Sequence, residues 1–95
     1  MSLEELRRRR SDILSLATRY GARNVRVFGS VARGIERTDS DIDLLVDVER
    51  GRSLLDVIAL EQELSELLGR RVEVLTDGGL SPYLKQQILS EAAFL

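Results

Sequence analysis

The stretch that decides the fold reads GSVARG at residues 29–34 and, after a short gap, DSDIDLLV at residues 39–46. The second segment places Asp41 and Asp43 two positions apart. Side chains at i and i+2 of a β-strand project from the same face, so we expect these two carboxylates to lie side by side. The apolar residues that alternate with them then point to the opposite face: Ile42, Leu44 and Val46.

Adjacent carboxylates repel each other unless a cation lies between them. Mg²⁺ takes oxygen ligands of this kind and also binds substrate phosphates. The turn at Gly29 and Ser30, just upstream, would hold those phosphates, so the pattern indicates metal-dependent phosphoryl or nucleotidyl transfer. The alternative is a solvated strand face within an acidic surface patch.

The composition restricts the chemistry that this chain can perform. Its 95 residues suffice for one small domain. The chain has no cysteine and no histidine. These absences exclude disulfides, thiolate and imidazole metal sites, and Ser-His-Asp or Cys-His catalysis. No apolar run approaches the roughly 20 residues of a membrane span, and we expect a cytoplasmic protein.

The charge distribution does not favour direct binding of nucleic acid. The net charge is −2, and the aromatic content is only 4%. A basic face with aromatic residues for base stacking is therefore missing. Acidic residues instead crowd one segment, which suits a metal with a phosphate ligand: Glu36, Asp39, Asp41, Asp43, Asp47 and Glu49.

Periodicity and turn residues predict a single α/β domain over residues 1–95, with a small β-sheet flanked by helices. A capping box at Ser2 and Glu5 begins a helix that we expect to end at Gly21. Arg10 interrupts the apolar stripe of this helix and could reach acidic groups of a partner. The remaining expected elements are strands at 25–28, 41–48 and 72–76, a helical turn at 30–33, and helices at 54–68 and from 81 onward.

The combined motif resembles the signature of the minimal nucleotidyltransferases, in the DNA polymerase beta-like nucleotidyltransferase superfamily. The residues that carry the resemblance are Gly29-Ser30-x-Ala32-Arg33-Gly34 followed by Ser40-Asp41-Ile42-Asp43-Leu44, and it extends over nearly the whole chain. It implies the polymerase beta-like nucleotidyltransferase fold, with a mixed sheet. Such minimal proteins resemble antitoxins whose partner is an all-helical HEPN-type toxin. The resemblance further implies transfer of AMP from ATP to a tyrosine of that partner.

The resemblance also implies roles for individual residues. Gly29 and Ser30 match the phosphate-binding turn, and Asp41 and Asp43 match the two metal-ligating aspartates for one or two Mg²⁺ ions. Glu73 stands where a third acidic residue is expected and where many relatives have aspartate. It would orient a second metal or accept the proton of the attacking hydroxyl. The alternative for Glu73 is an ordinary exposed strand residue.

Two other features keep alternatives open. Arg33 matches the arginine of the family's turn and could neutralise phosphate charge, but it could equally pair with Glu36 or Asp39. The helix at 54–68 carries leucines on more than one face, which indicates either a buried helix or one that associates with copies of the same chain.

Three functional hypotheses follow. The leading one is an enzyme that transfers AMP from ATP to a protein hydroxyl. We expect the acceptor to be a partner protein, because the assigned strands and helices leave no residues for a separate acceptor-binding domain. The second hypothesis is an antitoxin with weakened catalysis that neutralises its toxin by binding alone, and the third is a nucleotide-sensing subunit that binds ATP without turnover.

Overall fold

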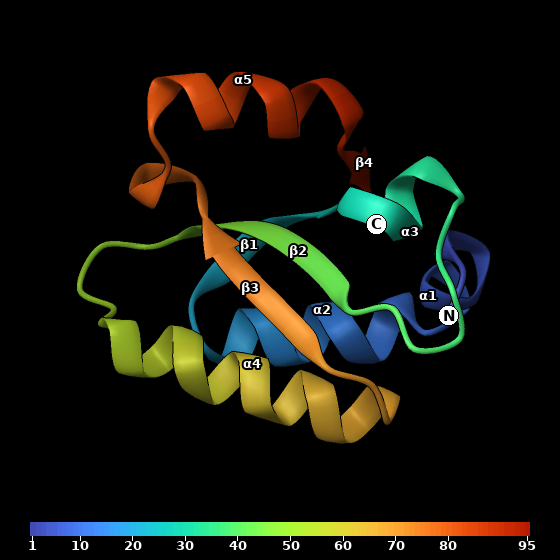
Figure 1. Ribbon diagram of the computed structural model, residues 1–95. Helices are drawn as coiled ribbons and strands as arrows, with labels where there is room; N and C mark the ends of the chain where they lie inside the picture. Colours follow the sequence, from blue (N-terminus) through green and yellow to red (C-terminus); the bar gives the residue numbers. More distant parts are fainter.

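The computed structural model describes all 95 residues. Four strands form one sheet, and helices pack on both of its faces (Figure 1). No helix is both long enough and apolar enough to cross a membrane. In chain order the elements are α1 (Leu3–Arg8), α2 (Arg10–Arg19), β1 (Ala22–Phe28), α3 (Gly29–Arg33), β2 (Ile42–Val48), α4 (Leu54–Leu68), β3 (Val72–Thr76), a 3₁₀ turn (Asp77–Gly79), α5 (Pro82–Glu91) and β4 (Ala93–Phe94).

The sheet is mixed, with the strand order β3-β2-β1-β4. β1 runs antiparallel to both of its neighbours, whereas β2 and β3 run parallel. The parallel pair is connected by α4, which provides the crossover that parallel strands require. The prediction of a small mixed sheet flanked by helices is therefore confirmed.

The two faces of the sheet differ in chemistry. α2 and α4 cover one face, and α5 lies over the other (Figure 1). The alternating apolar residues of the three long strands point toward α2 and α4, so this face forms the hydrophobic core. The other face carries the polar positions of the same strands, including Asp43 and Glu73. The fully buried side chains of the core include Leu6, Ile13, Val27, Ile42, Leu44, Val46, Leu60, Leu64 and Val72.

The N-terminal helix is interrupted, contrary to the prediction of one continuous helix. α1 ends and α2 begins around Arg9, whose backbone leaves the helical conformation. Its guanidinium donates to the carbonyl of Leu67 at 3.2 Å. Arg10 likewise donates to the carbonyl of Leu95 at 3.2 Å, so it binds the protein's own C-terminal segment. Arg9 and Arg10 thus make hydrogen bonds within the protein at the point where the apolar stripe of the N-terminal helix is interrupted.

The C-terminal segment adds a strand that the sequence did not predict. β4 pairs with β1 through the partners Arg26–Phe94 and Val27–Ala93, and Leu95 is buried in the core. A smaller difference concerns β2, which begins at Ile42 rather than at Asp41. Asp41 therefore lies directly before the strand.

The leucine-rich helix α4 is predominantly a core element. It begins after a capping box formed by Ser53 and Asp56, and it ends at Gly69. One face packs into the core through Leu60, Leu64 and Leu68. Leu54 and Leu55, in its first turn, are by contrast about three-quarters exposed.

Candidate active site

Two acidic side chains meet at one end of the sheet. β2 and β3 pair in parallel with Asp43 directly beside Glu73. Since both residues alternate with core residues, their side chains share the face opposite the core. Asp43 is also paired with Phe28, the last residue of β1, so the phosphate-turn candidate Gly29 follows at once. The structure therefore brings three predicted site residues from three separate segments into one place.

The acidic pair is electrostatically unfavourable when fully ionised. Burial, as the largest cause, and the charges of Glu73 and Asp41 together raise the pKa of Asp43 from 3.8 to about 6. A side-chain hydrogen bond with Glu73 acts in the same direction, whereas the Arg33 charge opposes it. No basic side chain forms an ion pair with Asp43, while Glu73 lies 3.3 Å from the exposed guanidinium of Arg71. The cluster thus has an excess of negative charge that a cation would relieve.

The donor set fits a hard divalent cation, although the side chains are not gathered around one. No three acidic residues lie close enough together to enclose a metal ion as they stand. Asp41 is nevertheless near enough to raise the pKa of Asp43, and all three candidate ligands offer carboxylate oxygens. Such oxygens suit Mg²⁺, which also keeps water and substrate phosphate oxygens in its coordination shell. The chemistry of Asp41, Asp43 and Glu73 therefore suits Mg²⁺.

The turn between β1 and α3 requires a glycine. Gly29 has φ +74°, in the left-handed region that glycine adopts readily. A Cβ at this position would also collide with the carboxylate of Asp43. Ser30 follows at the start of α3, and its hydroxyl makes no hydrogen bond within the protein. The turn therefore places the Gly29 backbone directly against the Asp43 carboxylate, and Ser30 follows one residue further on.

Arg33 has a partner that the sequence analysis missed. Its Nε lies 3.7 Å from Oε2 of Glu91 and 3.4 Å from the Gly29 carbonyl oxygen, to which it donates. Oε1 of Glu91 accepts a hydrogen bond from the Gly29 N–H at 3.2 Å. Neither Glu36 nor Asp39, the alternative partners suggested by the sequence, forms an ion pair with Arg33. No sequence signal links Glu91 to the turn, because 62 positions separate it from Gly29.

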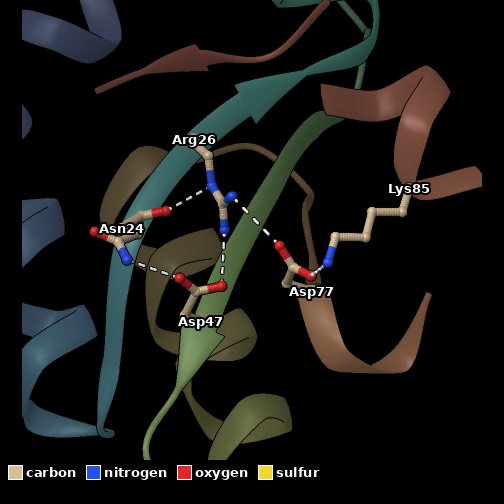
Figure 2. A network of polar contacts seen from close by, with 5 residues as sticks. All are labelled: Asn24, Arg26, Asp47, Asp77 and Lys85. Carbon is tan, nitrogen blue, oxygen red and sulfur yellow. Dashed lines mark hydrogen bonds and ion pairs between the residues drawn. The ribbon is translucent and has the colours of Figure 1, made fainter. Parts of the chain in front are cut away.

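The other end of the same sheet face carries a charge-balanced network (Figure 2). Arg26, only 7% exposed, lies between Asp47 at 3.0 Å and Asp77 at 3.5 Å. Lys85 of α5 contacts Asp77 at 2.7 Å, and this contact is the main reason that the pKa of Asp77 is lowered. Asn24 donates to Asp47 at 2.7 Å. These carboxylates therefore have cationic partners, unlike Asp43.

A model of the nucleotidyltransferase domain matches residues 4–95. The chain belongs to this family. Among curated relatives, the protein adenylyltransferase MntA of Thermococcus cleftensis is 41% identical over 80 residues, which cover 84% of this chain and 81% of that protein. A Methanocaldococcus jannaschii protein, assigned by its name to the protein adenylyltransferases, is 41% identical over 92 residues, or 97% of this chain and 96% of its own length.

Solved structures support the nucleotidyltransferase fold. One described as a minimal nucleotidyltransferase is 56% identical, with a TM-score of 0.89 over 100% of this chain and 97% of its own. A toxin–antitoxin complex with AMP-PNP gives a TM-score of 0.78 at 23% identity, covering 88% and 69% of the two chains. A Shewanella oneidensis complex of an AMPylated HEPN toxin with its MNT antitoxin gives 0.69 at 21% identity, covering 88% and 66%. The last two likenesses concern the fold alone.

Proposed function

We propose that this nucleotidyltransferase transfers AMP from ATP, with Mg²⁺, to a tyrosine hydroxyl of a HEPN-type toxin and thereby acts as its antitoxin. The observation that carries the proposal is the meeting of Asp43 and Glu73 beside the Gly29–Ser30 turn. Relatives named as protein adenylyltransferases support a protein acceptor. The structural neighbours that contain a HEPN toxin with an MNT antitoxin support the choice of partner.

Each site residue has a defined task in this reaction. The hydroxyl of Ser30, the backbone at Gly29 and the guanidinium of Arg33 bind the triphosphate and fix its orientation. Asp41, Asp43 and Glu73 hold the metal. Bound Mg²⁺ supplies charge neutralisation at the α-phosphate and at the leaving pyrophosphate.

The transfer is a simple exchange of one bond to phosphorus for another. The tyrosine oxygen forms a bond to the α-phosphorus, and the bond from that phosphorus to the bridging oxygen of the β-phosphate breaks. Pyrophosphate leaves, and the hydroxyl proton passes to a carboxylate of the site. Glu73 is suited to accept it, because its side chain is one methylene longer than that of Asp43 and is 44% exposed.

The test is a transfer assay with α-labelled ATP, Mg²⁺ and the HEPN-type protein encoded beside this chain, read by intact mass. We expect the partner to gain AMP, and the double variant D41N/D43N to abolish that gain. D39N is the matched control, because Asp39 is an exposed carboxylate of the same loop that makes no ion pair. Undiminished transfer by the double variant would refute the proposal.

Two further outcomes would identify the competing functions. A stoichiometric complex that silences the toxin without ATP, and without modifying it, would indicate an antitoxin that works by binding. Binding of ATP with neither transfer nor inhibition would indicate a nucleotide sensor.

A change in the elution volume of the isolated protein with concentration would show that the protein also associates with itself.

A further inference from the structure

Helix α5 crosses the sheet face that carries the acidic pair, but it is only loosely attached there (Figure 1). None of its side chains is buried, and Tyr83 is 73% exposed. Polar contacts hold it near both ends. Lys85 contacts Asp77 in the N-terminal half (Figure 2), and Glu91 contacts the phosphate turn at the C-terminal end. Because α5 itself buries no side chain, a small movement of the helix breaks few apolar contacts, although Leu45 on the same sheet face is fully buried.

The Glu91 carboxylate makes the contacts that the proposed function assigns to a nucleotide phosphate. One oxygen accepts from the Gly29 N–H at 3.2 Å, and the other lies 3.7 Å from Nε of Arg33. A backbone N–H and a guanidinium on either side of one anion are a usual phosphate-binding arrangement. The side chain is about one-third exposed, so the contact can break without a large opening of the protein.

We propose that Glu91 occupies the phosphate-binding turn of the nucleotide-free protein and must be displaced for ATP to bind. The inference rests on the assignment of the triphosphate to this turn. Two anions cannot share one N–H and one guanidinium, and their repulsion makes joint occupancy unfavourable. Since Glu91 is the last residue of α5, its departure removes the contact between that end of the helix and the turn, while the chain beyond it remains anchored by the pairing of β4 with β1. Glu91 therefore lowers the apparent affinity for ATP and couples nucleotide binding to the position of α5.

The decisive experiment compares the dissociation constants of AMP-PNP with Mg²⁺ for the wild type, E91Q and E66Q. Glutamine keeps the hydrogen-bond acceptor but loses the charge, which weakens the contact because charge-assisted hydrogen bonds are about twice as strong as neutral ones. We expect E91Q to bind AMP-PNP about fivefold more tightly. E66Q removes the same charge from an exposed position of α4, on the far side of the sheet, and should bind as the wild type does.

Two further probes, one with phosphate alone and one without phosphate, sharpen the comparison. Inorganic tripolyphosphate should show the same gain with E91Q, because it competes for the same N–H and guanidinium. Adenosine, which lacks phosphate, should bind equally to all three proteins or to none. A gain seen with adenosine as well would overturn the proposal, since it would indicate a general change in the site.

The response of α5 hydrogen exchange to AMP-PNP in the wild type is a readout that a purely structural role for Glu91 would not change. In the wild type, AMP-PNP should speed amide exchange in the last turn of α5. In E91Q that turn should exchange faster already without nucleotide. Slower exchange in α5 on binding, together with weaker binding by E91Q, would show that Glu91 stays in the closed site and would refute the proposal.

The outcomes separate this inference from the proposed function. Tighter binding by E91Q without modification of any partner would support the role of Glu91 and refute protein adenylylation. Equal binding by E91Q and wild type, with transfer intact, would refute the role of Glu91 alone. If neither protein binds AMP-PNP or tripolyphosphate, both proposals fail.

Discussion

Replacing Asp43 by asparagine should stabilise the metal-free protein at neutral pH while it abolishes AMP transfer. The pKa of Asp43 is raised from 3.8 to about 6 by burial and by the neighbouring carboxylates. A shift of about two units corresponds to ~3 kcal/mol at 1.36 kcal/mol per unit. Because the side chain is partly exposed, solvent screening reduces this to about 1–1.5 kcal/mol. Asparagine keeps the shape of the side chain and removes the unfavourable charge.

The sign of the pH dependence follows from the raised pKa. Between pH 4 and pH 6 the folded protein retains a proton on Asp43 that the unfolded chain has already lost. The free energy of unfolding of the wild type therefore falls as the pH rises through this window. D43N lacks this contribution, so the two proteins should differ little at pH 4 and by the full 1–1.5 kcal/mol above about pH 7.

The assay is thermal unfolding in EDTA at pH 4.5 and pH 7.5. For a domain of this size, a change of 1 kcal/mol in the free energy of unfolding shifts Tm by roughly 4–8 °C. The Tm of D43N should therefore lie about 5 °C above that of the wild type at pH 7.5. The exposed-site control D39N should change little at either pH. Mg²⁺ with AMP-PNP should then stabilise the wild type and not D43N, because ligand binding stabilises only a folded state that binds it. A D43N variant that is no more stable than the wild type at pH 7.5 would refute the reasoning.

Three further substitutions test other parts of the structure. G29A should lower the free energy of unfolding by about 1–3 kcal/mol and abolish AMP-PNP binding. The added methyl group would require a disfavoured backbone conformation and would displace the Asp43 carboxylate. Calorimetry measures both the unfolding and the binding. R26M should lower the free energy of unfolding in urea by about 1–3 kcal/mol, because it leaves Asp47 without a cation and Asp77 with Lys85 alone. L95A should lower the free energy of unfolding by about 2–3 kcal/mol in the same assay, because it removes a side chain that is buried in the core. An unchanged urea midpoint for either of the last two would contradict its assigned role.

The sequence predicted which residues of a strand share a face, but not which strands are neighbours. Alternation placed Asp43 and Glu73 opposite the apolar residues of their own strands, and the structure agrees. Their contact depends on the register of β2 and β3, which follows from how α4 packs its leucines and carries the chain across the sheet. The register between two strands that are far apart in the chain is a tertiary property, and it cannot be predicted from the local periodicity of either strand.

The missed features share a physical cause. Strand β4 has only two residues, too few to show any period, and its partners in β1 lie almost 70 positions earlier. From the sequence, Arg33 was equally suited to neutralise phosphate charge or to pair with acidic residues just downstream in the chain. Gly34, in the left-handed conformation, ends α3 and turns the chain away, so the anion that reaches Arg33 comes from the C-terminal helix instead. Closeness in sequence is therefore a poor guide to the ion-pair partner of a residue that is followed by a left-handed turn such as Gly34.

The polar face of the sheet shows how carboxylates with different roles can be told apart. Asp43 and Asp47 both lie on β2 and point to this face. Asp47 has Asn24 and the buried Arg26 as partners, so its charge is balanced within the protein and it stabilises the fold. Asp43 has no ion-pair partner and meets a second carboxylate instead, an arrangement that costs folding free energy. In the proposed function this unbalanced charge has a use, because the site would bind a cation together with a nucleotide phosphate.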